Sequence, residues 1–390
     1  MIVGVPLEME PGERRVALTP ANVAVLTSRG LLVLVEVGAG VSAGYLDSEY
    51  LAKGARLVEA RADLFNQANV VVQVRAAGAS PRSLPGDKQL YRPGQLVVAM
   101  LDPLSAPGAV LALAETGATA YALELVPRIT RAQSMDVLSS MATVAGYRAV
   151  LLAATALPRL FPMLMTAAGT LSPARTFVVG AGVAGLQAIA TARRLGSVVQ
   201  AYDVRPAVKE QVESLGGSFL EILPAEAAEG EGGYAREMDA AFYQRQQAAM
   251  AAAVAESNVV ITTAAVPGRK APVLVSAEMI AGMKPGSVVV DLAAERGGNC
   301  ELTVPGETVE KCGVSILGPL NLPAEVPFHS SQMFGKNVTE FLLNMLDDEG
   351  NLAPEKDDEI VKETAVCRSG VVTHPRVAAL LESKSSATGS

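Results

Sequence analysis

The sequence has few of the side chains that usually bind metals or form cross-links. Its 390 residues include no tryptophan, two histidines and three cysteines. Cys300, Cys312 and Cys367 are odd in number and show no CxxC spacing, so neither a disulfide framework nor a zinc site is predicted, and a reducing compartment fits. Because His329 and His374 are the only imidazoles, histidine-based catalysis and metal binding are not expected either.

The chain also lacks a basic stripe and an uninterrupted apolar run. Its net charge of −8 disfavours nucleic-acid binding, which needs clustered cations. The apolar stretch Met141–Met165 is interrupted by Arg148, Pro158 and Pro162 before about 20 continuous apolar residues, so it predicts a buried helix that runs toward the next domain. The chain opens on the strand Ile2–Val5 without a signal-peptide pattern, and no direct membrane insertion is expected.

The composition and the rhythm of the apolar runs indicate the fold class. Hydrophobic residues make up 50% of the chain, which is typical of buried parallel strands, and 390 residues suggest two domains. The rhythm predicts an α/β fold with two doubly wound parallel-sheet (Rossmann-like) domains separated by a cleft. The strand-like runs are Leu31–Val37, Val70–Val74, Leu96–Met100, Ala118–Ala122, Thr176–Val179, Val198–Tyr202, Val259–Thr263, Val288–Leu292 and Val314–Leu317.

A glycine-rich turn joins the strand Thr176–Val179 to the helix Leu186–Leu195. Gly180 suits the tight turn, Gly182 lets the backbone approach a pyrophosphate, and Gly185 lets the helix pack closely. The amides at the start of the helix would then face the phosphates, so the segment predicts a dinucleotide site. The alternative is a turn that only packs a helix on a sheet.

An acidic residue stands at the end of the next strand. Asp203 lies 23 positions after Gly180, where a carboxylate can accept hydrogen bonds from an adenosine ribose. This favours NAD over NADP, because a 2′-phosphate would meet a like charge. Arg205 leaves the alternative open, since its guanidinium can receive such a phosphate.

The helical pattern Ser330–Leu346 bears on the domain limits, because a helix that returns from the second domain would pack on the first. We therefore predict a discontinuous N-terminal domain of residues 1–137 plus about 325–380. Residues 138–324 would form the NAD(H)-binding domain, and residues 381–390, which are small and polar, a flexible tail.

An insertion rich in Glu, Gly and Ala runs from Pro224 to about Met238 and carries one aromatic residue, Tyr234. Several glycines, Gly233 among them, leave little to hold such a loop closed without a ligand, which suits a lid. An inert surface loop is the other interpretation.

Two motifs carry a family resemblance. The segment Gly4–Glu8 with Glu13–Pro20, and the segment Met283–Asn299, resemble the alanine dehydrogenase and nicotinamide nucleotide transhydrogenase superfamily over residues 1 to about 378. The dehydrogenases have a histidine where this chain has Asp102, and a substrate lysine for which Arg75 is the nearest match, although Arg15 remains. Oxidative deamination is therefore not expected.

The segment Pro127–Ser140 marks the transhydrogenase branch, and the chain carries it whole. With the Gly-Gly-Tyr of the insertion, it resembles the soluble NAD(H)-binding component of proton-translocating transhydrogenase. This resemblance implies that Arg128, Gln133 and Asp136 hold the nicotinamide ring and its ribose, and it places Ser139 in the same catalytic set. A solvated helix start is the alternative, because Thr130 and Gln133 also suit a capping box.

The resemblance also implies contacts at the adenosine end of the dinucleotide. Tyr234 would seal the site, and Glu295, which matches the catalytic acid of the dehydrogenases, is interpreted as structural or ribose-facing. The implied adenosine contacts are Val183, Asp203, Val204, Arg205, Gly233, Gln246 and Ala265.

The implied function is direct hydride transfer between NADH on this chain and NADP⁺ on a partner subunit, coupled to proton movement across a membrane. The implied cofactor of this chain is NAD(H), with NADP(H) on the partner. The expected partners are a second copy in a homodimer and the NADP(H)-binding and membrane-spanning subunits, which would hold the chain at the cytoplasmic face of the inner membrane. A stand-alone amino-acid dehydrogenase and a non-catalytic NAD(H) sensor remain alternatives.

Overall fold

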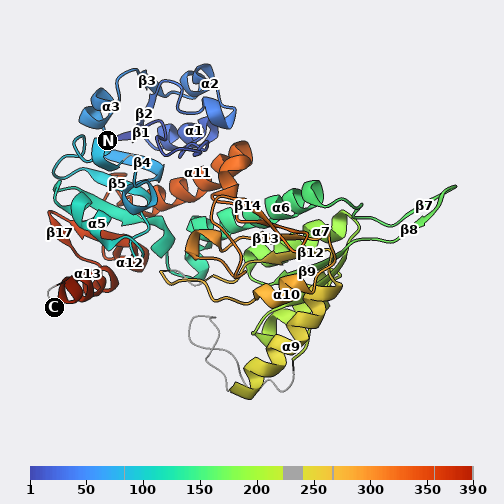
Figure 1. Ribbon diagram of the computed structural model, residues 1–390. Helices are drawn as coiled ribbons and strands as arrows, with labels where there is room; N and C mark the ends of the chain where they lie inside the picture. The colour runs from blue at the N-terminus through green and yellow to red at the C-terminus, as the bar shows by residue number, and fades with distance from the viewer. Residues whose placement is uncertain (83, 223–239, 266–267, 355, 389–390) are drawn as a thin grey trace. The chain divides into compact units, whose positions relative to one another are not determined.

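The computed structural model describes residues 1–82, 84–222, 240–265, 268–354 and 356–388 (Figure 1). The chain forms two compact units, one of residues 1–141 with 323–390 and one of residues 142–322. We call them unit 1 and unit 2. The first crossing between them falls inside helix α6 (Val137–Ala156).

Unit 1 contains an eight-stranded sheet in the order β17-β16-β6-β5-β4-β1-β2-β3. Strands β1 to β6 are parallel to one another, and β16 and β17 add an antiparallel edge. The parallel part has the Rossmann strand order. The strands are β1 (Ile2–Val5), β2 (Leu32–Glu36), β3 (Arg56–Val58), β4 (Val70–Arg75), β5 (Leu96–Met100), β6 (Thr119–Ala122), β16 (Ala365–Arg368) and β17 (Val371–Val372).

Helices cover both faces of this sheet, because alternate residues of each buried strand face opposite sides. In β4, Val70, Val72 and Val74 belong to one apolar core, whereas Val71 belongs to the other. The first core packs against α1 and α11, the second against α3, α5 and α13. The helices of the unit are α1 (Pro20–Ser28), α2 (Asp47–Ala52), α3 (Arg61–Gln67), α4 (Leu84–Asp87), α5 (Pro107–Ala114), α11 (Pro327–Asn344), α12 (Glu359–Thr364) and α13 (Pro375–Thr388).

Unit 2 repeats this architecture with a seven-stranded sheet in the order β11-β10-β9-β12-β13-β15-β14. Its strands are parallel apart from β14, which pairs antiparallel with β15. The prediction of an α/β fold with two doubly wound sheets is confirmed. The strands are β9 (Arg175–Val179), β10 (Val198–Tyr202), β11 (Ser218–Phe219), β12 (Val259–Thr262), β13 (Val288–Asp291), β14 (Thr308–Lys311) and β15 (Val314–Leu317), and the helices are α7 (Val183–Arg194), α8 (Lys209–Ser214), α9 (Ala240–Glu256) and α10 (Ala277–Ala281).

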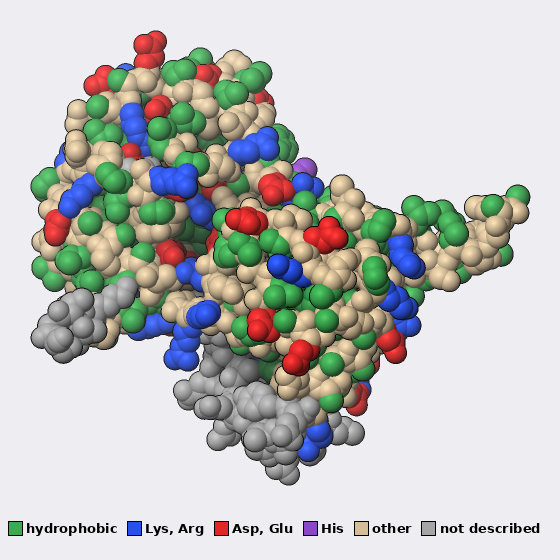
Figure 2. All heavy atoms as spheres, in the orientation of Figure 1, with side chains coloured by type: hydrophobic (Ala, Val, Ile, Leu, Met, Phe, Trp, Pro, Cys, Tyr) green, Lys and Arg blue, Asp and Glu red, His purple; other side chains and the backbone are tan. Residues whose placement is uncertain are grey.

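The apolar stretch after Met141 differs from its prediction. Helix α6 ends at Ala156, two residues before Pro158, and the chain then forms a hairpin of β7 (Leu164–Thr166) and β8 (Gly169–Leu171). The hairpin projects from unit 2, and apolar side chains lie along it, with Met165 78% exposed (Figure 1 and Figure 2). A single buried helix over the whole stretch is therefore wrong.

Two further helices bear on expectations from the sequence. By length and composition α6 could cross a membrane, with a mean hydropathy of 1.5, and 39% of its most apolar window is buried. Helix α13 continues to Thr388, into the segment 381–390 for which we predicted an irregular tail. Its Leu, Glu, Lys and Ala residues have high helix propensity, which outweighs the polar character on which that prediction relied.

Candidate functional site

The glycine turn of unit 2 stands where the strand order of the sheet reverses. Strand β9 lies between β10 and β12, so ligands of such sheets bind beside its carboxyl end. Gly180 has a φ of +97°, which a residue with a Cβ rarely adopts. A Cβ on Gly185 would lie 1.8 Å from the Gly180 carbonyl oxygen, whereas a Cβ on Gly182 would meet no described atom within 4 Å.

The three glycines therefore have different physical causes. Gly180 is required by its backbone angle and Gly185 by the close contact between α7 and the turn. No contact among the described residues requires Gly182, the N-cap residue of α7, so the open space beside it is available to a ligand. A phosphate there would meet the unpaired amides at the start of α7, and the residues present fit a dinucleotide. Val183 follows with an exposed side chain.

Asp203 connects the end of β10 to the glycine turn. Its side chain accepts hydrogen bonds from the Ala181 amide at 2.8 Å, the Arg205 amide at 2.9 Å and the Arg205 Nε at 2.9 Å. A second carboxylate oxygen contact, to Arg205 Nη2 at 2.9 Å, makes the ion pair bidentate. Asp203 is 9% exposed, and Val204 between the pair is half-buried. The guanidinium is thus committed to Asp203 before any ligand binds.

The loop after β12 is fixed against the same turn. The Thr263 hydroxyl donates to the Gly180 carbonyl oxygen at 2.9 Å. Asn299 accepts a hydrogen bond from the Ala264 amide at 2.9 Å and donates to the Ala264 carbonyl oxygen at 2.8 Å. Ala265, the next residue, is exposed. We did not predict this role of Asn299 from the sequence.

A buried carboxylate holds Asn299 in turn. Asp291, at the end of β13, is fully buried and accepts hydrogen bonds from the Asn299 amide at 2.8 Å and the Cys300 amide at 3.0 Å. The Thr262 hydroxyl donates to its other oxygen at 2.8 Å. Glu295 accepts a hydrogen bond from the Asn321 amide at 2.8 Å, so it has a structural partner within unit 2. An acidic residue directly after a buried strand was the available sequence signal.

The remaining predicted adenosine contacts separate into two groups. Gln246, in α9, is 6% exposed, and its amide donates to the Tyr202 hydroxyl at 3.0 Å, so its side chain packs under the end of β10. Gly233 and Tyr234 lie outside the described residues, as does the rest of the predicted lid.

The predicted nicotinamide residues lie in unit 1, at the approach to α6. Gln133 is exposed and falls in a 3-10 helix, Thr130–Met135, whose N-cap has no side-chain hydrogen bond. Asp136 instead caps α6, because its carboxylate accepts hydrogen bonds from the Ser139 amide at 2.9 Å and the Ser139 hydroxyl at 2.6 Å. The capping box that we considered at Thr130 and Gln133 is therefore displaced by one between Asp136 and Ser139. Arg128 is exposed just before this segment.

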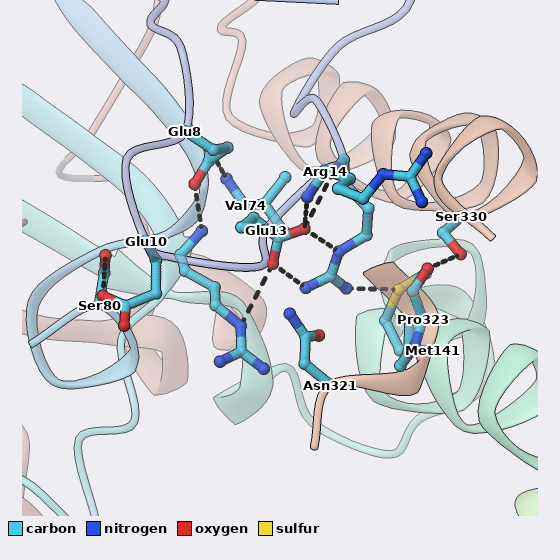
Figure 3. A network of polar contacts seen from close by, with 12 residues as sticks. Glu8, Glu10, Glu13, Arg14, Val74, Ser80, Met141, Asn321, Pro323 and Ser330 are labelled. Carbon is cyan, nitrogen blue, oxygen red and sulfur yellow. Dashed lines mark hydrogen bonds and ion pairs between the residues drawn. The ribbon is translucent and has the colours of Figure 1, made fainter. Parts of the chain in front are cut away.

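The switch point of unit 1, between β1 and β4, contains charged side chains in place of glycines (Figure 3). Glu13 accepts hydrogen bonds from Arg15 Nε at 2.7 Å and Nη2 at 2.6 Å, and Arg15 is only 2% exposed. Arg75 Nε lies 3.4 Å from the same carboxylate. Glu8 accepts hydrogen bonds from the Val74 amide at 2.6 Å and the Arg75 amide at 3.3 Å.

Burial raises the pKa of Glu8 to about 8, with a further contribution from the negative charge of Glu13. The same device recurs one strand away, where Glu124 accepts hydrogen bonds from the Leu101 amide at 2.8 Å and the Asp102 amide at 2.5 Å. Burial raises the pKa of Glu124 to about 7. Asp102 itself has a φ of +49°, so the end of β5 carries two carboxyl groups on a tightly turned backbone.

Comparison with known proteins agrees with this arrangement. The N-terminal domain of the alanine dehydrogenase/PNT family matches residues 4–145, and the C-terminal domain matches residues 149–375. The first portion of NAD(P) transhydrogenase subunit alpha of Rhodospirillum rubrum, a separate chain, is 47% identical over 378 residues, 96% of this chain and 98% of that protein. Alanine dehydrogenase of Bacillus subtilis is 30% identical over 97% of this chain and 94% of its own length.

A solved structure extends the likeness to three dimensions. The crystal structure of transhydrogenase from Sinorhizobium meliloti superimposes with a TM-score of 0.83 at 45% identity, covering 96% of this chain and 99% of that one. The chain therefore belongs to the alanine dehydrogenase/PNT family, and along nearly its whole length it is a homologue of the transhydrogenase alpha subunit.

Proposed function

We propose that this chain is the NAD(H)-binding component of a proton-translocating NAD(P) transhydrogenase. In this function a hydride, with its two electrons, leaves C4 of NADH and adds to C4 of NADP⁺ on a partner subunit, so neither an acid nor a base is needed for a substrate carbonyl. When bound, the nicotinamide supplies the hydride chemistry. The chain has to hold one ring face in place and exclude water.

The end of β5 is the observation that favours this function over amino-acid deamination. A keto-acid enzyme needs a proton donor there, and this chain has Asp102 with the buried Glu124 behind it. Neither His329, in α11, nor His374, before α13, follows that strand. Arg15, the other residue that would hold a substrate carboxylate, is already paired with Glu13 in a buried ion pair. An anionic substrate would have to displace that pair at the cost of burying an uncompensated charge.

The geometry of unit 2 supports a preference for NAD(H). Asp203 can accept the ribose hydroxyls from its place beside the turn, and its bidentate hold on Arg205 leaves that guanidinium neutralised toward a 2′-phosphate. We propose that Gly180, Gly182 and Gly185 admit the pyrophosphate, with Val183, Val204, Gln246 and Ala265 around the adenosine. The predicted contacts of Gly233 and Tyr234 remain within this proposal.

The proposed roles at the nicotinamide follow from the capping geometry. Asp136 is held in one orientation by Ser139, so its carboxylate is pre-organised before a ligand arrives. Gln133, exposed one turn earlier, can bond a carboxamide or ribose through its own amide, and Arg128 can reach a phosphate. We assign positioning, not proton transfer, to these residues.

We also propose the setting in which the chain acts. It would form a homodimer and dock the NADP(H)-binding and membrane-spanning subunits at the cytoplasmic face of the inner membrane. Its similarity to an alpha subunit supports this assignment. Light scattering on the purified chain measures its oligomeric state.

The test mixes the purified chain with the NADP(H)-binding subunit and follows reduction of an NADP⁺ analogue by NADH. We expect transfer only with both proteins present, and no NADH oxidation when the chain alone receives pyruvate and ammonia. Gln133→Asn should lower the transfer rate by at least about tenfold with little change in NADH affinity, whereas Gln67→Asn, at an exposed glutamine of α3, should change neither. Turnover of pyruvate by the chain alone would support the dehydrogenase instead. Binding without transfer under any pairing would support a sensor.

A further inference from the structure

A cavity in unit 1 lies at the antiparallel edge of the sheet, away from the switch point. Strands β5 and β6 separate β16 from β4, and the cavity is bounded by α12, β16 and the start of α13 (Figure 1). Its volume is about 220 Å³. The lining residues are Lys356, Lys362, Ala365, Arg368, Thr373, His374 and Pro375.

Cations dominate this lining. Lys356 Nζ donates to the carbonyl oxygens of Asn344 at 2.9 Å and Leu346 at 3.0 Å, so its ammonium is fixed at the wall and keeps one more N–H to donate. Arg368 is half-buried at the end of β16, and Lys362 pairs with the exposed Asp357.

The opposite wall combines a helix N-terminus with a buried imidazole. His374 precedes α13, a helix of 14 residues, and is 5% exposed. Its Nδ1 is buried and has no hydrogen-bond partner in the described part of the chain. Burial lowers the pKa of His374, against the charge of Glu363 and together with that of Arg376. A buried polar atom without a partner is costly unless a ligand or water satisfies it.

We propose that this cavity binds a phosphate-type oxyanion. The volume far exceeds the roughly 10–15 Å³ that one water needs and falls short of the roughly 300–1,000 Å³ typical of larger organic ligands. An oxyanion would accept hydrogen bonds from Lys356, Arg368 and His374 and would face the positive end of α13. The proposal does not depend on the function proposed above, because no residue of the cavity belongs to the dinucleotide site.

The two histidines of the chain make the test direct. The full-length protein, labelled with ¹³C-histidine, is titrated with inorganic phosphate in a phosphate-free buffer, and His329→Gln assigns the two imidazole signals. We expect the His374 signal to move saturably and its pKa to rise by about one pH unit as an anion settles nearby, while His329 stays unchanged. A His374 signal that stays still up to about 10 mM phosphate would overturn the proposal.

Charge-removing variants separate this site from general attraction. Arg368→Gln should weaken phosphate binding by at least about tenfold, and Lys362→Gln by less, because Lys362 is exposed. Lys88→Gln removes a distant surface lysine and should leave binding unchanged, and NADH affinity should stay the same in all three variants. Equal weakening by Lys88→Gln and Arg368→Gln would contradict a built site.

Vesicles identify the source of the anion. Co-sedimentation uses phosphatidylcholine vesicles with and without phosphatidic acid. Capture that needs both phosphatidic acid and Arg368 points to a lipid headgroup, whereas a response to free phosphate alone points to a soluble anion. The absence of both responses would refute the proposal.

Discussion

The two sheets share the order of their six central strands, yet their switch points have opposite contents. In unit 2 the crevice beside β9 is lined by glycines and backbone amides, and the carboxylate of Asp203 bonds the turn. In unit 1 the crevice between β1 and β4 contains the buried Glu13–Arg15 pair and the half-buried Glu8.

This difference shows what makes a doubly wound sheet a nucleotide site. The strand order places a crevice in both units, but among the described residues it is unit 2 that leaves backbone N–H groups and open space for an anion. In unit 1 side chains satisfy one another, so the same fold serves stability there and binding in the other unit. Substitutions at the two crevices should therefore have different consequences, which the following predictions use.

The largest effect should come from the glycine turn. Gly185→Ala places a methyl group 1.8 Å from the Gly180 carbonyl oxygen, so α7 must move, and we expect a loss of more than about 3 kcal/mol in stability together with the loss of NADH binding. Gly182→Ala meets no described atom within 4 Å, so the melting temperature should hardly change while NADH affinity falls at least about tenfold. Calorimetry and NADH titration measure both. Normal NADH affinity in Gly182→Ala would contradict a pyrophosphate at this position.

The second prediction concerns the charged crevice of unit 1. Glu13→Gln leaves Arg15 buried beside an amide, and we expect it to lower the free energy of unfolding by about 3–5 kcal/mol. The folded variant should still bind NADH with unchanged affinity. Glu115→Gln removes an exposed partner of Lys88 and is the matched control, at under about 1 kcal/mol. Urea unfolding of the three proteins provides the values, and a Glu13 variant as stable as the control would show that the buried pair is dispensable.

Local patterns were enough to predict the sheets and the glycine turn. Alternating burial and the valine-rich runs define β4 and β9, and the distance from Gly180 to Asp203 was readable because one strand and one helix fix it. These features depend on residues close in sequence.

The remaining features depend on partners that the sequence does not bring together. Glu8 bonds Val74, 66 residues away, so nothing local indicated that the carboxylate would be desolvated. The hairpin β7–β8 was missed because its apolar residues continue the pattern of α6, and only Pro158 marked the change. Asp136 provides the cap because α6 begins after it, a boundary too fine for propensity to set.

A smaller effect should follow from Asp203→Ala. The variant loses the ribose acceptor and the bond to the Ala181 amide, and we expect NADH binding to weaken by about 1.5–3 kcal/mol. Because Arg205 also loses its bidentate partner, the ratio of NADPH to NADH affinity should rise. Arg205→Gln keeps the bond from Asp203 to the turn and should change NADH affinity by less than about threefold. Titration with both nucleotides decides, and unchanged NADH affinity in Asp203→Ala would refute the ribose role.

The smallest effect is a pH dependence in unit 1. The pKa of Glu8 is about 8 in the folded chain, against 4.5 for a solvated glutamate, so the folded state holds a proton that the unfolded chain has released between those values. The contribution of Glu8 to stability is therefore fully present below about pH 4.5 and is lost as the pH rises to about 8, with a slope of at most about 1.4 kcal/mol per pH unit.

Glu8→Gln removes this titration but keeps an oxygen that can accept the amide hydrogen bonds of Val74 and Arg75. Urea midpoints of both proteins from pH 5.5 to 8.5 should diverge, with the wild type losing stability faster. Glu124, whose pKa is about 7, titrates in both proteins, so the difference between them isolates Glu8. Parallel curves would mean that the Glu8 carboxylate is solvated as a charge, and the crevice of unit 1 would then be as open to water as that of unit 2.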